Sequence, residues 1–336
     1  MAKKKVAING FGRIGRLFFR SAMKNPDFVK NYDVVAVNDL TDAKTLAHLL
    51  KYDSVHGVLD EEVTASDSFL FYKGKEIKIL AIKDPTQLPW KEYSVDLVIE
   101  CTGLYTKKNA ANVHLDQGAK KVLICAPAEC EGTFCLGVNA DKYDSKMKVV
   151  SMASCTTNSI APLLKVLCDE FGVKRGTLTT IHAYTNDQRI LDLPHSDLRR
   201  ARAAALSLIP SSTGAAKAIG LVVPELNGKM DGISIRAPVP DGSISDLTLE
   251  MSKTVTAEEV NKALKKASEG KMKGIMQFTM DQIVSSDIIG NSHTCIVDGS
   301  LTKVMDGNLL KVFSWYDNEW GYSSKLVEFA MQIVKP

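Results

Sequence analysis

The first strand-and-helix segment constrains the fold of this chain more than any other feature. Residues 6–8 form a short apolar run, residues 10–15 read Gly-Phe-Gly-Arg-Ile-Gly, and a helix-like apolar pattern follows. The pattern G-x-G-x-x-G between a strand and a helix is typical of a dinucleotide-binding βαβ unit. Gly10 permits a tight turn, Gly12 lets the backbone approach a pyrophosphate, and Gly15 lets the helix pack on the strand.

The end of the second strand predicts which dinucleotide binds. Residues 33–38 alternate as a strand and lead to Asp39. A carboxylate at this point binds both ribose hydroxyls and repels a 2′-phosphate, so the sequence favours NAD over NADP. Strand patterns at 95–99 and 121–125 extend a parallel sheet, and residues 69–72 and 76–80 predict an antiparallel pair.

Loops after parallel strands hold ligands in open α/β sheets. Thr102, Gly103 and Cys125 follow such strands, and they either line the cofactor groove or serve only as turn residues.

Composition excludes several classes of protein. The chain has 336 residues, of which 45% are hydrophobic, so two domains are expected. A net charge of +3 argues against a dedicated nucleic-acid partner, and no apolar run is long enough for a membrane span. The seven cysteines and the absence of a signal-peptide pattern predict reduced thiols in the cytoplasm. Cys125, Cys130 and Cys135 lack zinc-site spacing, so no metal is expected.

A cysteine occupies the junction between an apolar run ending at Val150 and a helix-like run over 160–171. Cys155 lies within Ser151-Met-Ala-Ser-Cys-Thr-Thr-Asn158, so the pattern places it at a helix N-terminus. Unpaired N–H groups and the helix dipole favour a thiolate there. The alternative is a buried structural cysteine beside an ordinary Ser/Thr cap.

Three further segments offer acid–base or anion-binding groups. The strand pattern at 176–181 leads to His182, which is either structural or a base. The strand pattern at 233–239 carries Arg236, which needs an anionic partner if buried. Residues 211–214, Ser-Ser-Thr-Gly, precede a helix-like run and form an anion nest or a plain cap.

The segment 186–202 is long, polar and irregular, as in functional loops and subunit contacts. Its arginines, Arg199, Arg200 and Arg202, suit phosphate binding or a solvated helix start. The remaining pattern predicts scaffold: strands at 245–253 and 293–299, a capping box at 256–259, a hairpin at Asp306-Gly307, and a final helix over 323–334 that returns to the first sheet.

Taken together, four segments resemble the phosphorylating glyceraldehyde-3-phosphate dehydrogenase family: 9–15, 153–158 (Ala-Ser-Cys-Thr-Thr-Asn), 182–188 (His-Ala-Tyr-Thr-Asn-Asp-Gln) and 315–322. The resemblance covers essentially the whole chain, and the cysteine motif is its most specific part. It implies an α/β fold with an N-terminal Rossmann NAD-binding domain (1–153), an α+β catalytic domain with a mainly antiparallel sheet (154–318), and a C-terminal helix (319–336) that packs on the first domain.

The resemblance implies NAD-dependent oxidative phosphorylation of D-glyceraldehyde 3-phosphate through a thiohemiacetal and a thioester. It implies Cys155 as the nucleophile, His182 as the base, inorganic phosphate as cosubstrate and a homotetramer in which residues 186–202 lie at subunit contacts. The resemblance implies that Thr185, Arg236 and Arg200 bind the substrate phosphate. It implies that the attacking phosphate is bound by Ser154, Thr156, Thr213 and Gly214. The positions that match the family's NAD site are Gly10, Gly12, Arg13, Ile14, Gly15, Asp39 and Asn318, with Lys83 where Arg is frequent and Cys125 where Ser or Thr is frequent.

Two alternatives stay open from the sequence. A sister enzyme acting on erythrose 4-phosphate would use the same nucleophile with hydrolysis in place of phosphate attack. A nonenzymatic NAD-binding or adhesive protein would use the same scaffold without the chemistry.

Overall fold

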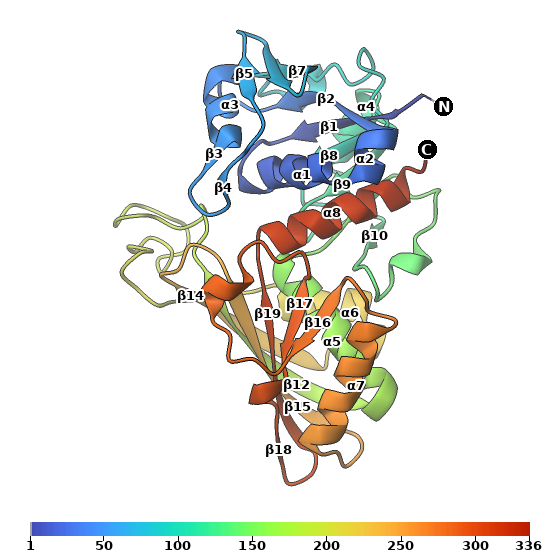
Figure 1. Cartoon of the computed structure of the whole chain (residues 1–336), viewed down its shortest axis with the longest axis vertical. Helices are drawn as coiled ribbons and strands as arrows, with labels where there is room; N and C mark the ends of the chain where they lie inside the picture. The colour runs from blue at the N-terminus through green and yellow to red at the C-terminus, as the bar shows by residue number, and fades with distance from the viewer. Residues whose placement is uncertain (1) are drawn as a thin grey trace. The chain divides into compact units, whose positions relative to one another are not determined.

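The structure is a computed structural model that describes residues 2–336 and divides into two compact units. Unit 1 holds Met1–Phe134, Lys142–Ala153 and Leu326–Pro336, and unit 2 holds Cys135–Asp141 and Ser154–Lys325. Each unit has its own sheet and helices, and both ends of the chain belong to unit 1 (Figure 1).

Unit 1 contains a nine-stranded sheet in the order β10-β11-β9-β8-β1-β2-β7-β6-β5. All neighbours from β10 to β7 are parallel, which confirms the predicted parallel sheet. Strand β6 pairs antiparallel with β7, which confirms the predicted antiparallel pair, and β5 extends it on the other side of β6. The strands are β1 Lys4–Asn9, β2 Tyr32–Asn38, β5 Val63–Ala65, β6 Phe69–Tyr72, β7 Lys75–Leu80, β8 Leu97–Glu100, β9 Lys121–Ile124, β10 Gly132–Thr133 and β11 Val149–Ser151. The helices are α1 Arg13–Lys24, α2 Pro26–Asn31, α3 Ala43–Lys51 and α4 Asn112–Asp116, and β3 Tyr52–Asp53 pairs with β4 Gly57–Val58.

The glycine turn between β1 and α1 has the geometry that its residues predict. Gly10 has φ +90°, which is a backbone conformation that L side chains rarely adopt. A Cβ on Gly15 would meet the carbonyl oxygen of Gly10, so only glycine allows α1 to begin this close to the turn. The turn therefore leaves the N-terminus of α1 at the carboxyl edge of the sheet.

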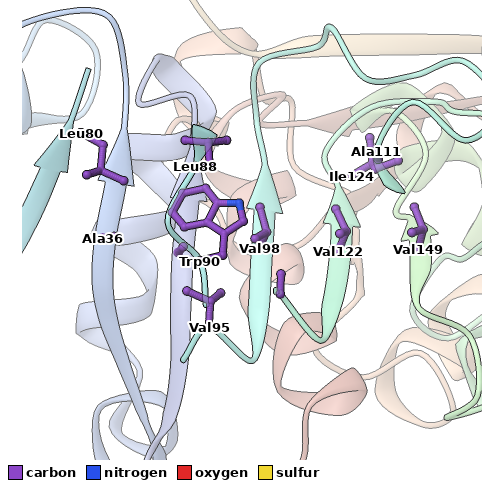
Figure 2. Close-up of a cluster of buried hydrophobic side chains, with 12 residues drawn as sticks. Ala36, Leu80, Leu88, Trp90, Val95, Val98, Ala111, Val122, Ile124 and Val149 are labelled. Carbon is purple, nitrogen blue, oxygen red and sulfur yellow. The ribbon is translucent and has the colours of Figure 1, made fainter. Parts of the chain in front are cut away.

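One face of the unit 1 sheet is covered by an apolar cluster (Figure 2). Trp90 lies fully buried beside Val95 and Val98, and its indole N–H donates to His114 Nδ1 at 3.1 Å. The returning segment of the C-terminal helix packs in the same unit, where the Tyr32 hydroxyl donates to the Val334 carbonyl at 2.6 Å. This return confirms the predicted place of the final helix.

Unit 2 contains an eight-stranded sheet in the order β13-β14-β12-β15-β19-β17-β16, with β18 on β19. Only β12/β14 and β16/β17 are parallel, so the predicted mainly antiparallel sheet is confirmed. Helices α5, α6 and α7 lie on one face of it (Figure 1). The strands are β12 Val173–Ala183, β13 Ile209–Ser212, β14 Met230–Ala237, β15 Ser243–Met251, β16 Met276–Thr279, β17 Cys295–Asp298, β18 Lys303–Met305 and β19 Leu309–Tyr316. The helices of unit 2 are α5 Cys155–Phe171, α6 Ala215–Val222 and α7 Ala257–Glu269, and α8 Trp320–Ile333 begins in unit 2 and continues into unit 1. The 3₁₀ turns of the two units are η1 Pro85–Gln87, η2 Ala140–Lys142, η3 Pro224–Leu226, η4 Ser285–Ile288 and η5 Gly299–Leu301, of which η1 belongs to unit 1.

Element ends differ from the sequence expectations by a few residues. Helix α8 begins at Trp320 instead of residue 323, because the Asp317 carboxylate accepts from the N–H groups of Glu319 and Trp320 and caps the helix there. The predicted capping box at Thr256 and Glu259 is present and opens α7. Within residues 2–336, every helix is too short or too polar to cross a bilayer.

Candidate active site

A groove of about 480 Å³ lies at the carboxyl edge of the unit 1 sheet. The glycine turn, the end of β2 and the loops after β7 and β8 form its walls. It is lined by Asn9, Gly10, Gly12, Asn38, Asp39, Leu40, Ile82, Lys83, Pro85, Leu88, Cys101, Thr102, Leu104 and Tyr105. Thr102, for which the sequence left two readings, is therefore a groove residue.

The groove has the charge and the open backbone that a dinucleotide requires. The Asp39 carboxylate is held in place by the N–H groups of Phe11 at 2.8 Å and Thr41 at 3.2 Å, and its remaining lone pairs can accept from ribose hydroxyls. Nothing lies within 4 Å of a Cβ built on Gly12, so this backbone borders open space. Lys83 supplies a cation on the same groove. The residues present therefore fit an NAD molecule.

Some positions that the resemblance assigns to NAD have other roles in unit 1. The Arg13 guanidinium pairs with Asp53 at 2.6 Å, so its side chain is held by β3. Cys125 is absent from the groove lining, whereas its neighbour Cys101 is present. Ile14 and Gly15 lie in the first turn of α1, directly after the glycine turn.

In unit 2, Cys155 is the first residue of α5, as the sequence predicts. Ser154 is the N-cap, and its hydroxyl oxygen accepts from the N–H of Thr157 at 3.0 Å. His182 lies near the end of β12, and its Nε2 is 3.4 Å from the Cys155 Sγ. The helix start and the strand end thus bring together the two groups whose proximity the sequence left open.

Strand register places Arg236 beside the imidazole. Strands β12 and β14 are parallel, with His182 opposite Arg236. The Arg236 Nη1 lies 2.8 Å from His182 Nδ1 and donates to the Ala183 carbonyl at 3.2 Å. The same carbonyl lies 2.7 Å from Nδ1, which either donates to it or accepts from Arg236. Only the tautomer with Nδ1–H donating to the Ala183 carbonyl leaves the Nε2 lone pair toward the thiol, and a role of His182 as base requires that tautomer.

Burial governs the protonation of this pair. Burial raises the pKa of the Cys155 thiol to about 11, although Arg236 and the N–H of Thr156 act in the opposite direction. Burial and then Arg236 lower the pKa of His182 to about 3. Each group alone therefore favours its neutral form, contrary to the thiolate that the helix N-terminus predicts, because desolvation outweighs the helix end. A thiolate at this site requires transfer of the thiol proton to Nε2, where each charge stabilises the other.

Two buried side-chain donors of unit 2, one of them on Arg236, lack an acceptor. Within residues 2–336, Arg236 Nε and Gln188 Nε2 are buried without a hydrogen-bond partner, while Gln188 Oε1 accepts from the N–H of Thr185. Unpaired buried donors are costly, and Arg236 Nε belongs to a positive guanidinium, so a bound anion would satisfy it.

Other candidate anion ligands differ in how freely they face a ligand. The Thr156 hydroxyl is buried between the Tyr316 hydroxyl, at 2.9 Å, and the Cys155 thiol, to which it also hydrogen-bonds. Thr213 and Gly214 lie at the start of α6, where the Thr213 hydroxyl accepts from the N–H of Ala215 at 3.2 Å. Residues 213 and 214 therefore precede a helix, as the sequence predicts, and the choice between an anion nest and a plain cap stays open.

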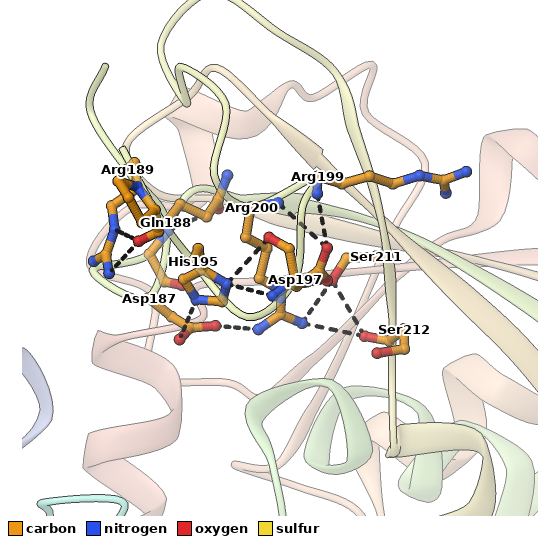
Figure 3. Close-up of polar contacts among 11 residues, drawn as sticks. Asp187, Gln188, Arg189, His195, Asp197, Arg199, Arg200, Ser211 and Ser212 are labelled. Carbon is orange, nitrogen blue, oxygen red and sulfur yellow. Dashed lines mark hydrogen bonds and ion pairs between the residues drawn. The ribbon is translucent and has the colours of Figure 1, made fainter. Parts of the chain in front are cut away.

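The irregular segment 186–202 holds its own polar network (Figure 3). The Arg200 guanidinium pairs with the Asp187 carboxylate and donates to the Ser211 hydroxyl at 2.8 Å through Nε. The charge of Arg200 is thereby neutralised within the segment. Arg202 pairs with Asp192 at 3.0 Å. The Arg200 side chain is less exposed to solvent than the Arg202 side chain.

The sequence reasoning missed two residues of unit 2. Tyr316 is buried at the end of β19, donates or accepts at both Thr156 and Thr180, and meets the His182 ring edge-on at 6.0 Å. Gln188 lies in the segment 182–188, whose pattern assigns it no separate role. Asn318 lies nearby in the chain, and its Oδ1 accepts from the Ser243 hydroxyl at 2.6 Å. Only the alternation that buries Tyr316 could have pointed to it.

Comparison with known proteins agrees with this geometry. Residues 4–108 match the family model described as glyceraldehyde 3-phosphate dehydrogenase, NAD binding domain, and residues 154–318 match that of the C-terminal domain. The chain belongs to the glyceraldehyde-3-phosphate dehydrogenase family. Relatives with that name from Geobacillus stearothermophilus and Borreliella burgdorferi are 57% and 56% identical, over 98% of this chain and 98% and 100% of theirs. Glyceraldehyde-3-phosphate dehydrogenase 1 of Bacillus subtilis is 55% identical over 98% of both chains.

In this chain, Cys155 at the start of α5 and His182 of β12 lie in unit 2, and Arg236 lies next to His182. The glycine turn and Asp39 lie together in the other unit, which contains the match to the NAD binding domain. The family resemblance proposed from four sequence segments is thus confirmed.

Proposed function

We propose that this protein is an NAD-dependent phosphorylating glyceraldehyde-3-phosphate dehydrogenase. The observation that carries the proposal is the 3.4 Å contact between Cys155 Sγ and His182 Nε2, beside Arg236, in a chain of this family. A thiol within reach of a base is the arrangement that nucleophilic catalysis requires. The product is 1,3-bisphosphoglycerate, formed from D-glyceraldehyde 3-phosphate and inorganic phosphate.

Cys155 and His182 divide the covalent chemistry. The Cys155 sulfur adds to the aldehyde carbon while its proton passes through Nε2 to the carbonyl oxygen, which gives a thiohemiacetal. His182 Nε2 then takes the hydroxyl proton as the carbon–hydrogen bond breaks, and a thioester remains on Cys155. When bound, NAD would supply the acceptor for the hydride that leaves this carbon. The N–H at the start of α5 can stabilise the oxyanion, a role typically worth about 3–4 kcal/mol.

The reaction needs two anion sites, because substrate and nucleophile each carry a phosphate. We assign the substrate phosphate to Arg236 and Thr185, since Arg236 Nε lacks an acceptor and Thr185 adjoins Gln188. Arg200 joins them only if its pair with Asp187 opens. The attacking phosphate is assigned to backbone and hydroxyl groups at two helix starts, namely Ser154, Thr156, Thr213 and Gly214.

We assign NAD to the groove of unit 1, with Asp39 on the ribose, the backbone of Gly10 and Gly12 on the pyrophosphate, and Lys83 as a nearby cation. Further proposed contacts are Arg13, Ile14, Gly15, Cys125 and Asn318. In this scheme residues 1–153 bind nucleotide, residues 154–318 carry the chemistry and residues 319–336 pack on the first domain. We also propose a homotetramer that works in the cytoplasm.

Steady-state kinetics test the proposal. NAD reduction is followed at saturating glyceraldehyde 3-phosphate with and without phosphate, for the wild type, Cys155→Ser and the control Cys168→Ser on the same helix. We expect phosphate-dependent activity that is lost in Cys155→Ser and kept in Cys168→Ser. Unchanged activity in Cys155→Ser would refute the covalent mechanism.

A parallel measurement with erythrose 4-phosphate separates the sister enzyme. Much faster turnover of that sugar without phosphate would replace the proposed substrate. No NAD reduction with either sugar would favour a nonenzymatic protein.

A further inference from the structure

Two cysteines meet at the edge of the groove in unit 1. The Sγ atoms of Cys101 and Cys125 lie 3.2 Å apart, and no other cysteine pair within residues 2–336 makes a sulfur–sulfur contact. Both side chains are half-buried. The proposed catalytic chemistry uses neither thiol, and both belong to a chain expected to keep its cysteines reduced.

Backbone pairing holds this contact in place. Strands β8 and β9 are parallel neighbours with Glu100 opposite Ile124, so the next residues, Cys101 and Cys125, project to the same side. The N–H of Cys125 donates to the Glu100 carbonyl at 2.9 Å, and the N–H of Cys101 donates to the Asn9 carbonyl at 2.7 Å. A disulfide at about 2.05 Å needs the sulfur atoms to move roughly 1 Å closer, within reach of small rotations.

Cys101 connects this pair to the groove. It lines the groove together with Thr102, whose N–H donates to the Glu100 carboxylate at 2.8 Å. A Cβ built on Gly10 would lie 2.9 Å from the Cys101 carbonyl carbon and the Thr102 nitrogen, so the glycine turn packs directly on this segment. Drawing Cys101 toward Cys125 therefore disturbs the surface on which Gly10 rests.

We propose that Cys101 and Cys125 form a reversible disulfide that weakens nucleotide binding. The oxidant is a hydroperoxide. Each peroxide accepts two electrons and two protons from the two thiols, its O–O bond breaks to give an alcohol (or water) and water, and one S–S bond forms. Burial and the neighbouring Cys101 raise the pKa of the Cys125 thiol well above its usual range, so the reaction should be faster at alkaline pH.

The proposal rests on the assignment of NAD to this groove. It also links NAD binding and disulfide formation in both directions. If the disulfide lowers NAD affinity by a given factor, bound NAD disfavours the disulfide by the same factor. Peroxide should therefore close the bond more readily in the free protein than in the NAD complex.

The test uses full-length protein in a Cys155→Ser background, so that oxidation of the catalytic cysteine does not contribute. Hydrogen peroxide is added, and non-reduced tryptic digests are examined by mass spectrometry for a link between residues 92–107 and 122–142. NAD affinity is measured by calorimetry before oxidation, after it, and after dithiothreitol. Because residues 122–142 also contain Cys130 and Cys135, the added variants are Cys101→Ser, Cys125→Ser and the control Cys130→Ser.

We expect the link in the background protein and in the Cys130→Ser control, with at least a tenfold rise in the NAD dissociation constant that dithiothreitol reverses. Cys101→Ser and Cys125→Ser should each lose the link and show the same affinity before and after peroxide. A link that persists in Cys125→Ser, or one that leaves NAD affinity unchanged, would overturn the proposal. A reduced protein that binds NAD but forms no link overturns this proposal alone, whereas a reduced protein that does not bind NAD overturns the proposed function as well.

Discussion

Replacing Tyr316 by Phe removes one hydroxyl from the polar layer behind the catalytic pair. In the wild type this hydroxyl bonds to Thr156 at 2.9 Å and to Thr180 at 2.8 Å. Thr180 keeps longer contacts to the Ile244 carbonyl and the Ser245 hydroxyl, at 3.4 Å and 3.5 Å. The buried Thr156 hydroxyl loses its strong partner and keeps only a weaker hydrogen bond to the Cys155 thiol, so it is the group left poorly satisfied.

One unsatisfied buried hydroxyl costs about 1–3 kcal/mol, and we expect the lower half of that range because the phenyl ring keeps its packing. Equilibrium urea unfolding, followed by tryptophan fluorescence at one protein and NAD concentration, measures the change. The matched control is Tyr93→Phe in unit 1, whose hydroxyl makes no hydrogen bond within residues 2–336.

The same substitution should raise the KM for inorganic phosphate several-fold, because Thr156 is an assigned ligand of the attacking phosphate. The His182 ring keeps its edge-on aromatic neighbour, so alkylation of Cys155 by iodoacetamide should change little. A loss of stability below about 0.5 kcal/mol, equal to that of Tyr93→Phe and with an unchanged KM for phosphate, would refute the reasoning.

Three further predictions follow from single contacts. Burial raises the pKa of Asp53, but the N–H of His56 and the Arg13 guanidinium outweigh burial and lower this pKa to about 2. The folded-state pKa therefore lies below the unfolded value. The ionised Asp53 stabilises the fold fully above about pH 4, and this stabilisation is lost as the pH falls through about 2. Arg13→Met should therefore move the acid-unfolding midpoint to higher pH in a circular dichroism titration, and an unmoved midpoint contradicts this. Arg236→Gln should raise the KM for glyceraldehyde 3-phosphate about 10- to 100-fold, since a charged hydrogen bond is worth about 1.5–3 kcal/mol, and an equal KM would remove Arg236 from the substrate site. Asp39→Asn should raise the ratio of kcat/KM with NADP to that with NAD about tenfold, because the charge that repels the 2′-phosphate is gone; a constant ratio speaks against this role.

Local patterns predicted most of the fold. The glycine turn, the position of Cys155 at a helix start and the capping box of α7 depend on residues within a few positions of one another. The first and last residues of the elements were predicted less accurately. Helix α8 begins before its apolar pattern does, because Asp317 caps the helix and a polar cap does not belong to the apolar pattern.

Charge states and pairings required the folded chain. A helix N-terminus predicts an acidic thiol at Cys155, yet burial raises its pKa to about 11. Among the groups that lower this pKa is Arg236, which lies 81 positions away in the sequence (236 − 155). The sequence assigns Arg200 to the substrate phosphate, but in the folded chain its charge is paired with Asp187. Both residues lie in an irregular segment, so no periodicity could have predicted this contact.

The order of residues by itself determined the glycine turn, the acid after the second strand, the cysteine at the start of α5 and the histidine and arginine on separate strands, because each depends on local backbone geometry. The register of β12 with β14 decided that Arg236 lies beside His182, and the pairing of β8 with β9 decided that Cys101 meets Cys125. Register and burial are set by contacts between residues tens of positions apart. A pattern read along one strand does not carry that information.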